Sequence, residues 1–199
     1  MPYASYVIWN NKGGTGKTTI TFQLSADYAE LHPEKTIVVI DMCPQANVSS
    51  ALLAKSNNPL NPGQVQLTNR KIPSNVFLMC GDLYLEELSR RLEQERHLMP
   101  IAGNSPWKRV TLFIKDYVER LSQNGDYVFF IDTNPSFSIY TEMAISAAER
   151  LIVPYTADDF SLSAIKAMFY LVYGIQTDEN DHRRNFVEHQ YYQLAKLIK

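Results

Sequence analysis

The chain has 199 residues, of which 45% are hydrophobic and 20% charged, and its formal net charge is −2. These values are typical of one folded domain and exclude a mainly disordered chain. They also exclude a protein whose whole surface attracts nucleic acid, although a local basic patch remains compatible with them. Two cysteines are too few for a disulfide framework, and no apolar run approaches the roughly 18 residues of a membrane span. We expect a cytoplasmic protein, since the N-terminal sequence MPYASYVIWNN also lacks the layout of a signal peptide.

Short apolar runs alternate with helical patterns along the chain. Runs rich in β-branched or aromatic residues predict strands, and apolar residues at helical spacing predict helices. The predicted strands cover residues 6–9, 36–40, 76–80, 127–131 and 151–154. The predicted helices cover residues 17–31, 83–98, 107–122, 140–148, 161–173 and 182–199. Residues 55–75 are rich in proline and asparagine and predict a surface loop.

The strand predicted at residues 36–40 is apolar on both faces, which is typical of a parallel strand buried from both sides. Strand–helix alternation of this kind predicts an α/β fold, with a mostly parallel sheet, helices on both faces and right-handed crossovers. We expect residues 1–199 to form a single domain. The helix at residues 17–31 should end before Pro33. Its apolar residues roughly fit one helical face: Ile20, Phe22, Leu24, Tyr28 and Leu31.

A glycine-rich segment lies between the first predicted strand and the first predicted helix, and it consists of Lys12, Gly13, Gly14, Thr15, Gly16, Lys17, Thr18 and Thr19. Glycines let the backbone turn tightly, so that successive N–H groups point at phosphate oxygens. The following helix adds the positive end of its dipole. In such a loop Lys17 reaches the β- and γ-phosphates and the Thr18 hydroxyl binds Mg²⁺. The segment therefore predicts a nucleotide-binding phosphate loop.

One position departs from the general pattern GxxxxGK[ST], because Asn11 stands where a glycine is expected. The pattern KGGxGK[ST] fits completely from Lys12 onward, and this resembles the deviant Walker A motif of the ParA/MinD family of partition and positioning ATPases. Residues 40–47 (IDMCPQAN) resemble the family's switch segment IDxDPQxN, and residues 130–136 (FIDTNPS) resemble its Walker B segment IDxxPS. Residues 78–83 (LMCGDL) are similar to a weaker PGDL element of the ParA branch. The resemblance implies a P-loop NTPase fold of the SIMIBI type that binds ATP or ADP with Mg²⁺.

Roles for individual residues follow partly from physics and partly from the resemblance. Asp132 ends a predicted strand beside the phosphate loop, where it is placed to hold Mg²⁺ through water. Asp41 is a further candidate for the Mg²⁺ shell or for orienting the attacking water. In the family the additional lysine, here Lys12, reaches the partner's nucleotide, which implies an ATP-bound homodimer. A second cation at the γ-phosphate would stabilise charge in the transition state, so Lys12 joins Lys17 as a predicted catalytic residue.

Cys43 stands at the second acidic position of the family's DxDPQ, the position associated with the attacking water. A thiol is a poor hydrogen-bond acceptor and is uncharged near neutral pH. We therefore expect slow or negligible hydrolysis, with nucleotide binding largely kept. Four explanations of Cys43 stay open: a natural variant with altered turnover, an engineered change that traps the ATP state, compensation by another group, and a redox-sensing thiol.

The resemblance implies an ATPase that switches between ADP and ATP-dimer states in plasmid or chromosome partition. It also implies nonspecific DNA and a ParB-like centromere-binding activator as partners, with nucleoid association of the ATP-bound form. Basic residues near one another in the sequence either face solvent or contact DNA phosphates; they are Arg90, Arg91, Arg96, Lys108 and Arg109.

Two alternatives belong to other functional classes. One is a MinD-like membrane-positioning ATPase, but residues 191–199 are only faintly amphipathic, so we expect no stable membrane anchor. The other is a regulatory ATP-binding module without turnover, which Cys43 favours. The chain ends after the fifth predicted strand, whereas proteins resembling it usually continue. It is therefore expected to be either a compact family member or a C-terminally shortened one.

Overall fold

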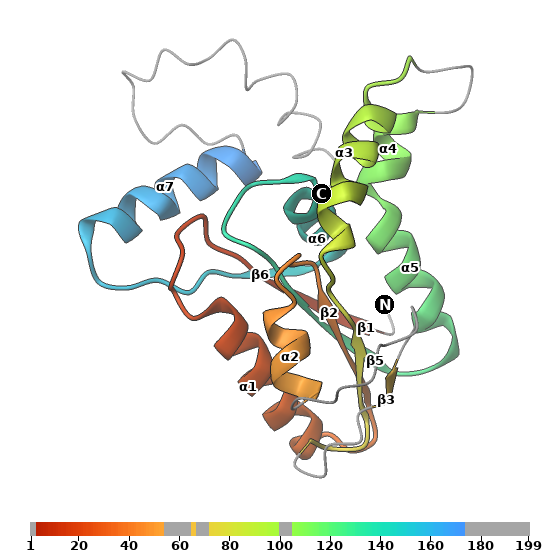
Figure 1. Ribbon diagram of the computed structural model, residues 1–199. Coiled ribbons are helices and arrows are strands. Elements are labelled where there is room, and N and C mark those ends of the chain that lie inside the picture. The colour runs from red at the N-terminus through yellow and green to blue at the C-terminus, as the bar shows by residue number, and fades with distance from the viewer. Residues whose placement is uncertain (1–2, 54–64, 67–71, 100–104, 174–199) are drawn as a thin grey trace.

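The computed structural model describes residues 3–53, 65–66, 72–99 and 105–173, and Figure 1 shows them around a central sheet. The sheet has six strands in the order β3-β4-β2-β5-β1-β6. The strands are β1 (Tyr3–Ile8), β2 (Thr36–Asp41), β3 (Val65–Gln66), β4 (Val76–Met79), β5 (Tyr127–Asp132) and β6 (Arg150–Ile152). Every neighbouring pair is parallel except β3 and β4. The predicted α/β fold with a mostly parallel sheet is therefore confirmed.

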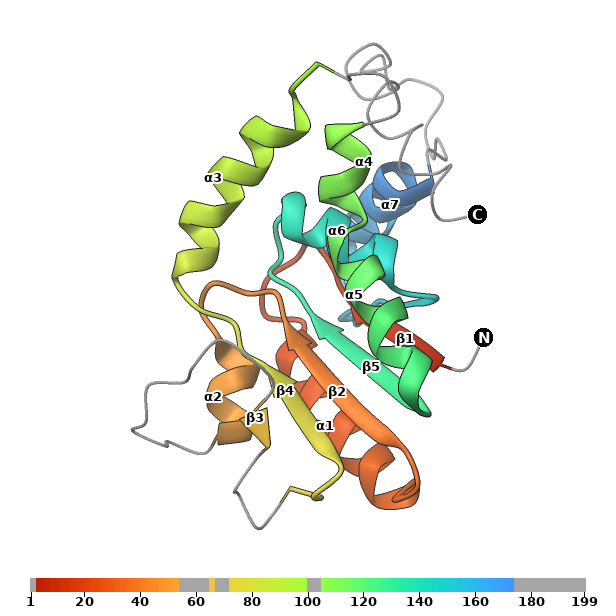
Figure 2. The ribbon, with the colours of Figure 1, turned by 90° about the vertical axis from the view of Figure 1, so that its right-hand side faces the viewer.

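Helices cover both faces of this sheet, as Figure 2 shows. They are α1 (Lys17–Leu31), α2 (Asn47–Leu53), α3 (Tyr84–Arg96), α4 (Pro106–Thr111), α5 (Phe113–Leu121), α6 (Ile139–Ala147) and α7 (Asp159–Tyr173), with a 3₁₀ turn η1 (Ser122–Asn124) after α5. Helices α1 and α2 lie on one face, and α3 to α6 lie on the other. Met168 and Val172 of α7 join the core on the side of α4 to α6.

The two central strands explain why their sequences are apolar at almost every position. In β2, Val38 and Ile40 join the core on the side of α4 to α6, whereas Ile37 and Val39 join the core beneath α1 and α2. Strand β5 alternates in the same way along Tyr127–Asp132. Successive side chains of a strand point to opposite faces, so a strand covered on both faces buries apolar side chains in both cores.

Two local predictions need correction, and one helix was missed. The helix predicted at residues 107–122 is two helices, because the chain leaves helical geometry at Leu112 (φ −90°, ψ 1°) between α4 and α5. The segment predicted as a loop contributes the short strand β3, and the rest of it up to residue 71 lies outside the described residues. The short helix α2 was not predicted. The helix predicted at residues 182–199 lies outside the described residues.

Helix α1 has the predicted bounds but buries a different face. The buried side chains are Lys17, Thr21, Ser25 and Ala29, whereas 76% of Leu31 is exposed. Small residues at a four-residue spacing let the helix axis approach the sheet closely, while Ile20, Phe22 and Tyr28 pack at the flanks of the core. Ile20, Phe22 and Tyr28 of the predicted face thus contact the core, whereas Leu24 and Leu31 are exposed. Hydrophobicity alone marks the wide flanks of this helix and not its line of closest approach.

The register of the parallel strands decides where the functional residues meet. Ile8 of β1 pairs with Asp132 of β5, and Asp132 pairs in turn with Asp41 of β2. The carboxyl ends of β1, β2 and β5 therefore lie side by side at one edge of the sheet, and the glycine-rich loop leaves β1 at this edge. Ligands of open α/β sheets bind at this kind of edge.

Candidate functional site

The loop between β1 and α1 has the backbone of a phosphate-binding turn. Gly14 (φ 73°) and Gly16 (φ 81°) adopt left-handed conformations that favour glycine. A Cβ atom placed on Gly13, Gly14 or Gly16 would have no heavy atom within 4 Å, so the loop surface is open on that side. Helix α1 starts directly after Gly16, and Ile20 N donates to Gly16 O over 2.8 Å. The loop thus presents backbone donors and a helix start to one open space.

Lys17 is the first residue of α1, and its side chain reaches back to the loop. Only 6% of Lys17 is exposed, and its Nζ donates to the Lys12 carbonyl oxygen over 2.9 Å. Burial lowers the pKa of Lys17 below its ordinary value, an effect that the charge of Asp132 opposes. The Thr15 hydroxyl contacts the same Lys12 carbonyl at 3.4 Å. The Lys17 ammonium is therefore held at the loop, where a phosphate bound by the loop would contact it.

Asp132 is the acceptor at the centre of the site. Its Oδ2 accepts a hydrogen bond from Thr18 Oγ1 at 2.9 Å, and its Oδ1 accepts one from Thr21 Oγ1 at 3.0 Å. Burial, and then the negative charge of Asp41, raise the pKa of Asp132 to about 6. A buried carboxylate beside a like charge gains much from a divalent cation. The pairing of Thr18 with Asp132 fits the donor set that Mg²⁺ prefers.

Asp41 is held by three donors. Its Oδ1 accepts from Cys43 N at 3.0 Å, and its Oδ2 accepts from Ser49 N at 3.0 Å and from Ser49 Oγ at 2.7 Å. Burial raises the pKa of Asp41, and the bonds from Ser49 oppose that shift. Within the described residues no group of three or more His, Cys, Asp or Glu side chains could hold a metal ion. A Mg²⁺ ion here would therefore also need oxygens of the nucleotide, of Thr18 or of water.

Cys43 lies in this buried region, with 6% of its surface exposed. Burial raises the pKa of its thiol, and the nearby charges of Asp41 and Asp132 raise it further. The side chain is therefore a neutral thiol at physiological pH. A neutral, buried thiol has little of the thiolate character that a redox sensor needs, so the geometry disfavours that explanation of Cys43.

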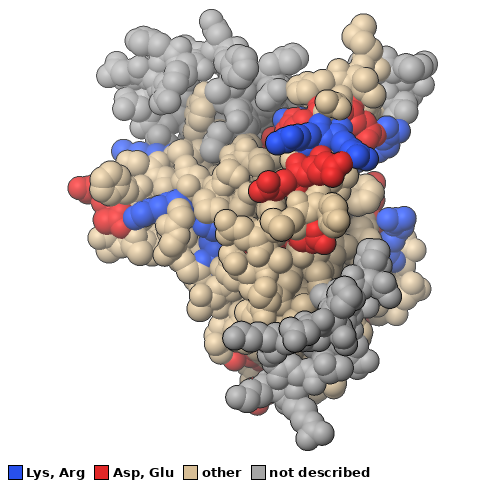
Figure 3. All heavy atoms as spheres, viewed as in Figure 1, with Lys and Arg blue, Asp and Glu red and all other residues tan. Residues whose placement is uncertain are grey.

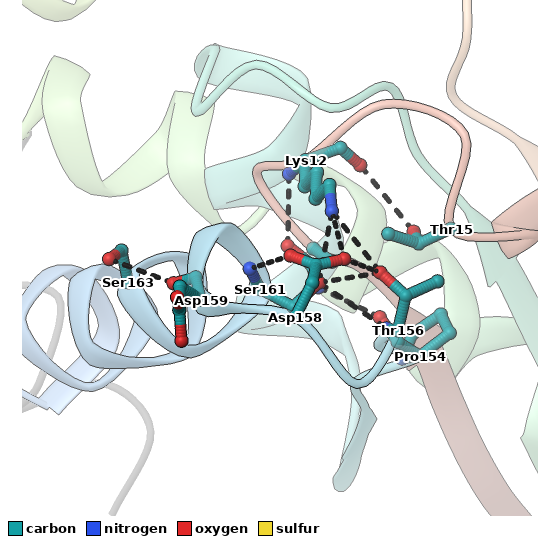
Figure 4. Close-up of polar contacts among 9 residues, drawn as sticks. Lys12, Thr15, Pro154, Thr156, Asp158, Asp159, Ser161 and Ser163 are labelled. Atoms are coloured by element: carbon teal, nitrogen blue, oxygen red, sulfur yellow. Dashed lines mark hydrogen bonds and ion pairs between the residues drawn. The ribbon is translucent and has the colours of Figure 1, made fainter.

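The Lys12 side chain points toward the start of α7, as Figure 4 shows. Its Nζ lies 2.7 Å from Asp158 Oδ2, 3.1 Å from Thr156 Oγ1 and 3.2 Å from Ser161 Oγ. Hydrogen bonds from Lys12, from Thr156 and from the Ser161 N–H keep the pKa of Asp158 well below its usual range. The side chains of Lys12 and Asp158 remain 30% and 36% exposed. This ion pair therefore lies at the surface, where solvent or another ligand can compete for it.

Asn10 connects the phosphate loop to the chain that precedes α7. Its Oδ1 accepts from Lys12 N at 2.9 Å, and its Nδ2 donates to Pro154 O at 2.7 Å. The side chain is almost fully buried. The start of the loop and the connection between β6 and α7 are therefore fixed to each other on the protein side of Lys12.

Comparison with known proteins places this arrangement in a family. A family model described as an AAA domain (AAA_31) matches residues 5–184. The chain belongs to the ParA/MinD-type P-loop ATPases. It is 29% identical over 182 residues to the chromosome-partitioning ATPase Soj of Treponema pallidum, covering 87% of this chain and 65% of Soj. The chain spans less than two thirds of the length of the curated relatives it matches.

Two solved structures share the fold. The ATP complex of a Cyanothece McdA variant superposes with a TM-score of 0.67 at 23% identity, covering 85% of this chain and 63% of that one. Cobyrinic acid a,c-diamide synthase of Mycobacterium smegmatis, with ADP and magnesium bound, gives a TM-score of 0.65 at 19% identity, covering 87% and 69%. A ParA/MinD-type fold thus also serves a biosynthetic enzyme, so function must be argued from the site.

The structure brings six of the predicted site residues together around the carboxyl edge of the central strands: Lys12, Lys17, Thr18, Asp41, Cys43 and Asp132. Their roles toward a nucleotide and Mg²⁺ stay predictions. Thr19 is exposed on α1 and joins none of the hydrogen bonds described above. Sequence reasoning missed five polar residues that hold the predicted ones: Asn10, Thr21, Ser49, Asp158 and Ser161. Only Thr21 carried a usable signal, since it lies one helical turn after Lys17.

The basic residues that could have contacted DNA are mostly paired with acids. Arg91 contacts Glu87 at 2.6 Å, Arg96 contacts Glu93 and Glu142, and Arg109 contacts Glu95. Figure 3 shows basic and acidic side chains next to one another over α3. This favours an ion-paired helix surface over a positive field. Among the described residues, no helix has the length and apolar character needed to cross a bilayer.

Proposed function

We propose that the protein is a ParA-type ATPase that acts as an ATP-dependent dimerising switch in plasmid or chromosome partition. The observation that carries this proposal is the different surroundings of the two loop lysines. Lys17 is buried and bonds to the loop backbone, where it is suited to the nucleotide of its own chain, whereas the Lys12 side chain is 30% exposed and pairs with Asp158 at the surface. A lysine that is exposed beside the phosphate loop is suited to a nucleotide held by a second chain.

Mg²⁺ and the protein's own groups divide the work in this proposal. Backbone donors of residues 13–17 bind the phosphates, and Thr18 and Asp132 hold Mg²⁺, which neutralises phosphate charge. Solved structures of the same fold in complex with ATP, or with ADP and magnesium, support the binding of a nucleotide and Mg²⁺. Asp41 orients water near the ion. Lys12 of each chain stabilises the charge that develops on the other chain's γ-phosphate.

Slow hydrolysis is part of the proposal. The family's second switch carboxylate is replaced by Cys43, and the raised pKa of this thiol leaves it neutral. A neutral thiol is a weak acceptor for the proton or the hydrogen bond of an attacking water. The ATP-bound dimer therefore lasts longer than in a relative with aspartate at this position, and an activator of the ParB type has more control over its lifetime.

Dimerisation must break the Lys12–Asp158 contact, because one ammonium group cannot serve Asp158 and a second nucleotide fully at once.

Light scattering after size-exclusion chromatography should give a monomer with ADP and a dimer with ATP and Mg²⁺. Lys12→Ala should remain a monomer with ATP. Lys35→Ala removes a different lysine paired with an aspartate, Asp126 at 3.7 Å, and should dimerise normally.

A monomer under all conditions would contradict the switch. The ATP-bound dimer should also shift DNA of arbitrary sequence in a gel and should fail to float with anionic vesicles. Flotation without a DNA shift would favour the membrane-positioning class. A stable dimer without measurable turnover, even with Asp at position 43, would favour a regulatory module.

A further inference from the structure

Ser49 joins separate parts of the site edge. It lies in α2 with 3% of its surface exposed, and Asp41, its partner, has 2% exposed. Ser49 contacts Asp41 Oδ2 twice, through its backbone N–H at 3.0 Å and its hydroxyl at 2.7 Å. The hydroxyl also accepts from Gly81 N at 3.0 Å. Ser49 therefore bonds both to the carboxylate at the end of β2 and to the chain leaving β4.

The Gly81 contact fixes the direction of these bonds. A backbone N–H can only donate, so the Ser49 oxygen must act as acceptor toward Gly81. The single hydroxyl proton is then free to point to Asp41, which receives it on Oδ2. Serine thus acts as a donor of defined orientation and not as a hydroxyl that rotates among partners. A charge-assisted bond of this kind is stronger than a neutral one.

Within the part of the chain that the structure describes, these three donors leave one acceptor position of the Asp41 carboxylate without a hydrogen bond. Its two oxygens offer about four lone-pair sites. Ser49 fills both sites of Oδ2, and Cys43 N fills one site of Oδ1. The remaining acceptor site lies on Oδ1, on a carboxylate whose neighbour in the sheet register is Asp132.

The Gly81 backbone passes close to the Asp41 carboxyl group. A Cβ atom at Gly81 would lie 2.6 Å from Cys43 O, 2.8 Å from Asp41 Cγ and 3.0 Å from Asp41 Oδ1. A residue with a side chain would therefore need Cys43 or Asp41 to move. Glycine at this position lets the backbone bond to Ser49 without displacing the carboxylate that Ser49 holds.

We propose that Ser49 is a positioning residue: it holds Oδ2 of Asp41 so that Oδ1 keeps its open acceptor site for a water of the Mg²⁺–nucleotide complex. This inference rests on the proposed nucleotide-binding function and extends it to a residue outside the motifs. Ser49 touches neither nucleotide nor metal in this proposal. Loss of its hydroxyl should therefore weaken the contribution of Mg²⁺ to nucleotide binding and leave the phosphate loop itself intact.

The test measures the affinity of a fluorescent methylanthraniloyl-ATP in Mg²⁺ and in EDTA, which needs no turnover. For Ser49→Ala, the gain in affinity on adding Mg²⁺ should fall about tenfold, as expected for the loss of a group that orients a metal-site ligand. The affinity in EDTA should stay within about twofold of the parent value, and Ser49→Thr, which keeps the hydroxyl, should restore the gain. Ser49→Cys keeps the size but hydrogen-bonds weakly, and it should behave like Ser49→Ala if the alanine variant does not fold.

Ser122→Ala is the matched control. Ser122 is also 3% exposed, but its hydroxyl donates only to Val118 O of the preceding helix turn, at 2.7 Å. This variant should keep the full Mg²⁺ effect. An unchanged Mg²⁺ effect in both Ser49→Ala and Ser49→Cys would overturn the inference alone, and so would an equal loss in Ser49→Thr. A parent protein that binds the analogue in neither buffer would overturn the proposed function as well.

Discussion

Asp41 and Asp132 lie almost fully buried at the ends of neighbouring strands, whereas Lys12 and Asp158 meet at the surface between a loop and the start of α7. The first pair carries like charges that the register of the sheet holds together. The second pair carries opposite charges that only side chains hold. The two buried carboxylates therefore favour the binding of a cation between them. The exposed ion pair can instead be replaced when Lys12 binds a group that interacts with it more strongly. Changes in the buried region should alter stability and chemistry, and changes at the surface should alter association.

The largest effect is expected at Gly81, where the buried region has no spare space. Gly81→Ala would place a methyl group against Cys43 O and the Asp41 carboxyl, which should lower the free energy of unfolding by about 3 kcal/mol. Gly125→Ala is the control, since its Cβ would meet only the Tyr127 side chain, at 3.1 Å. Urea unfolding of both variants measures the difference. Equal losses would mean that the Asp41 region is less rigid than its packing indicates.

The next effect is a dependence of stability on pH. Between the ordinary carboxyl pKa and the raised pKa of Asp132, about 6, the folded state binds more protons than the unfolded state. The free energy of unfolding therefore falls as pH rises through this window. Without Mg²⁺, Asp132→Asn should stabilise the protein at pH 8 by about 2 kcal/mol, and the gain should shrink toward pH 5. Asp126→Asn, which changes an exposed carboxyl, should show no such trend, and a gain independent of pH would refute the charge argument.

Position 43 tests the chemistry of the buried region. Cys43→Asp should raise the rate of ATP hydrolysis about tenfold, equivalent to about 1.4 kcal/mol in activation free energy. The same change adds a third carboxylate beside Asp41 and Asp132, so it should also lower stability without Mg²⁺. Cys43→Ser supplies a neutral side chain of similar size and should turn over as slowly as the parent. Equal rates for all three proteins would exclude a role of Cys43 in slow hydrolysis.

The smallest effect belongs to the exposed pair. Asp158→Asn keeps an oxygen that can accept from Ser161 N–H at the start of α7, but it removes the charge that attracts Lys12. An exposed ion pair contributes less than about 1 kcal/mol, so the ATP concentration needed for half-maximal dimerisation should fall about threefold. Sedimentation velocity across an ATP titration measures it, with Asp126→Asn as control. A higher ATP requirement would show that Asp158 assists the dimer and does not compete with it.

The contrast between the two regions also explains what the sequence could predict. Lys17, Thr18 and Asp132 could be proposed from the sequence because glycine-rich turns and buried strands leave local patterns, and the register of a parallel sheet then brings strand ends together. Ser49 and Asp158 were missed because their partners are set by tertiary packing. A single serine after a strand, or one aspartate before a helix, resembles many that have no functional contact.

The helices show the same division. The bounds of α1 followed from Gly16 and Pro33, both of which leave a clear local mark. Helix α2 has only seven residues, too few for a helical period to stand out, and it forms where Ser49 bonds to Asp41. The helix predicted at residues 107–122 is divided at Leu112, and no glycine or proline at that point of the sequence signals the break. Local propensity thus predicted the long elements, and long-range contacts decided the short ones.

The place of β1 in the sheet sets an order of events during synthesis. The strand and its phosphate loop are made before the other strands of the sheet, yet both neighbours of β1 are made late, since Tyr3 pairs with Tyr127 and Tyr6 pairs with Arg150. Pairings between such distant residues close slowly and late in folding. The loop receives its supporting strands only when β5 and β6 have left the ribosome. A nascent chain that stops before β5 therefore contains the whole phosphate-loop motif and lacks the two strands that flank β1 in the finished sheet.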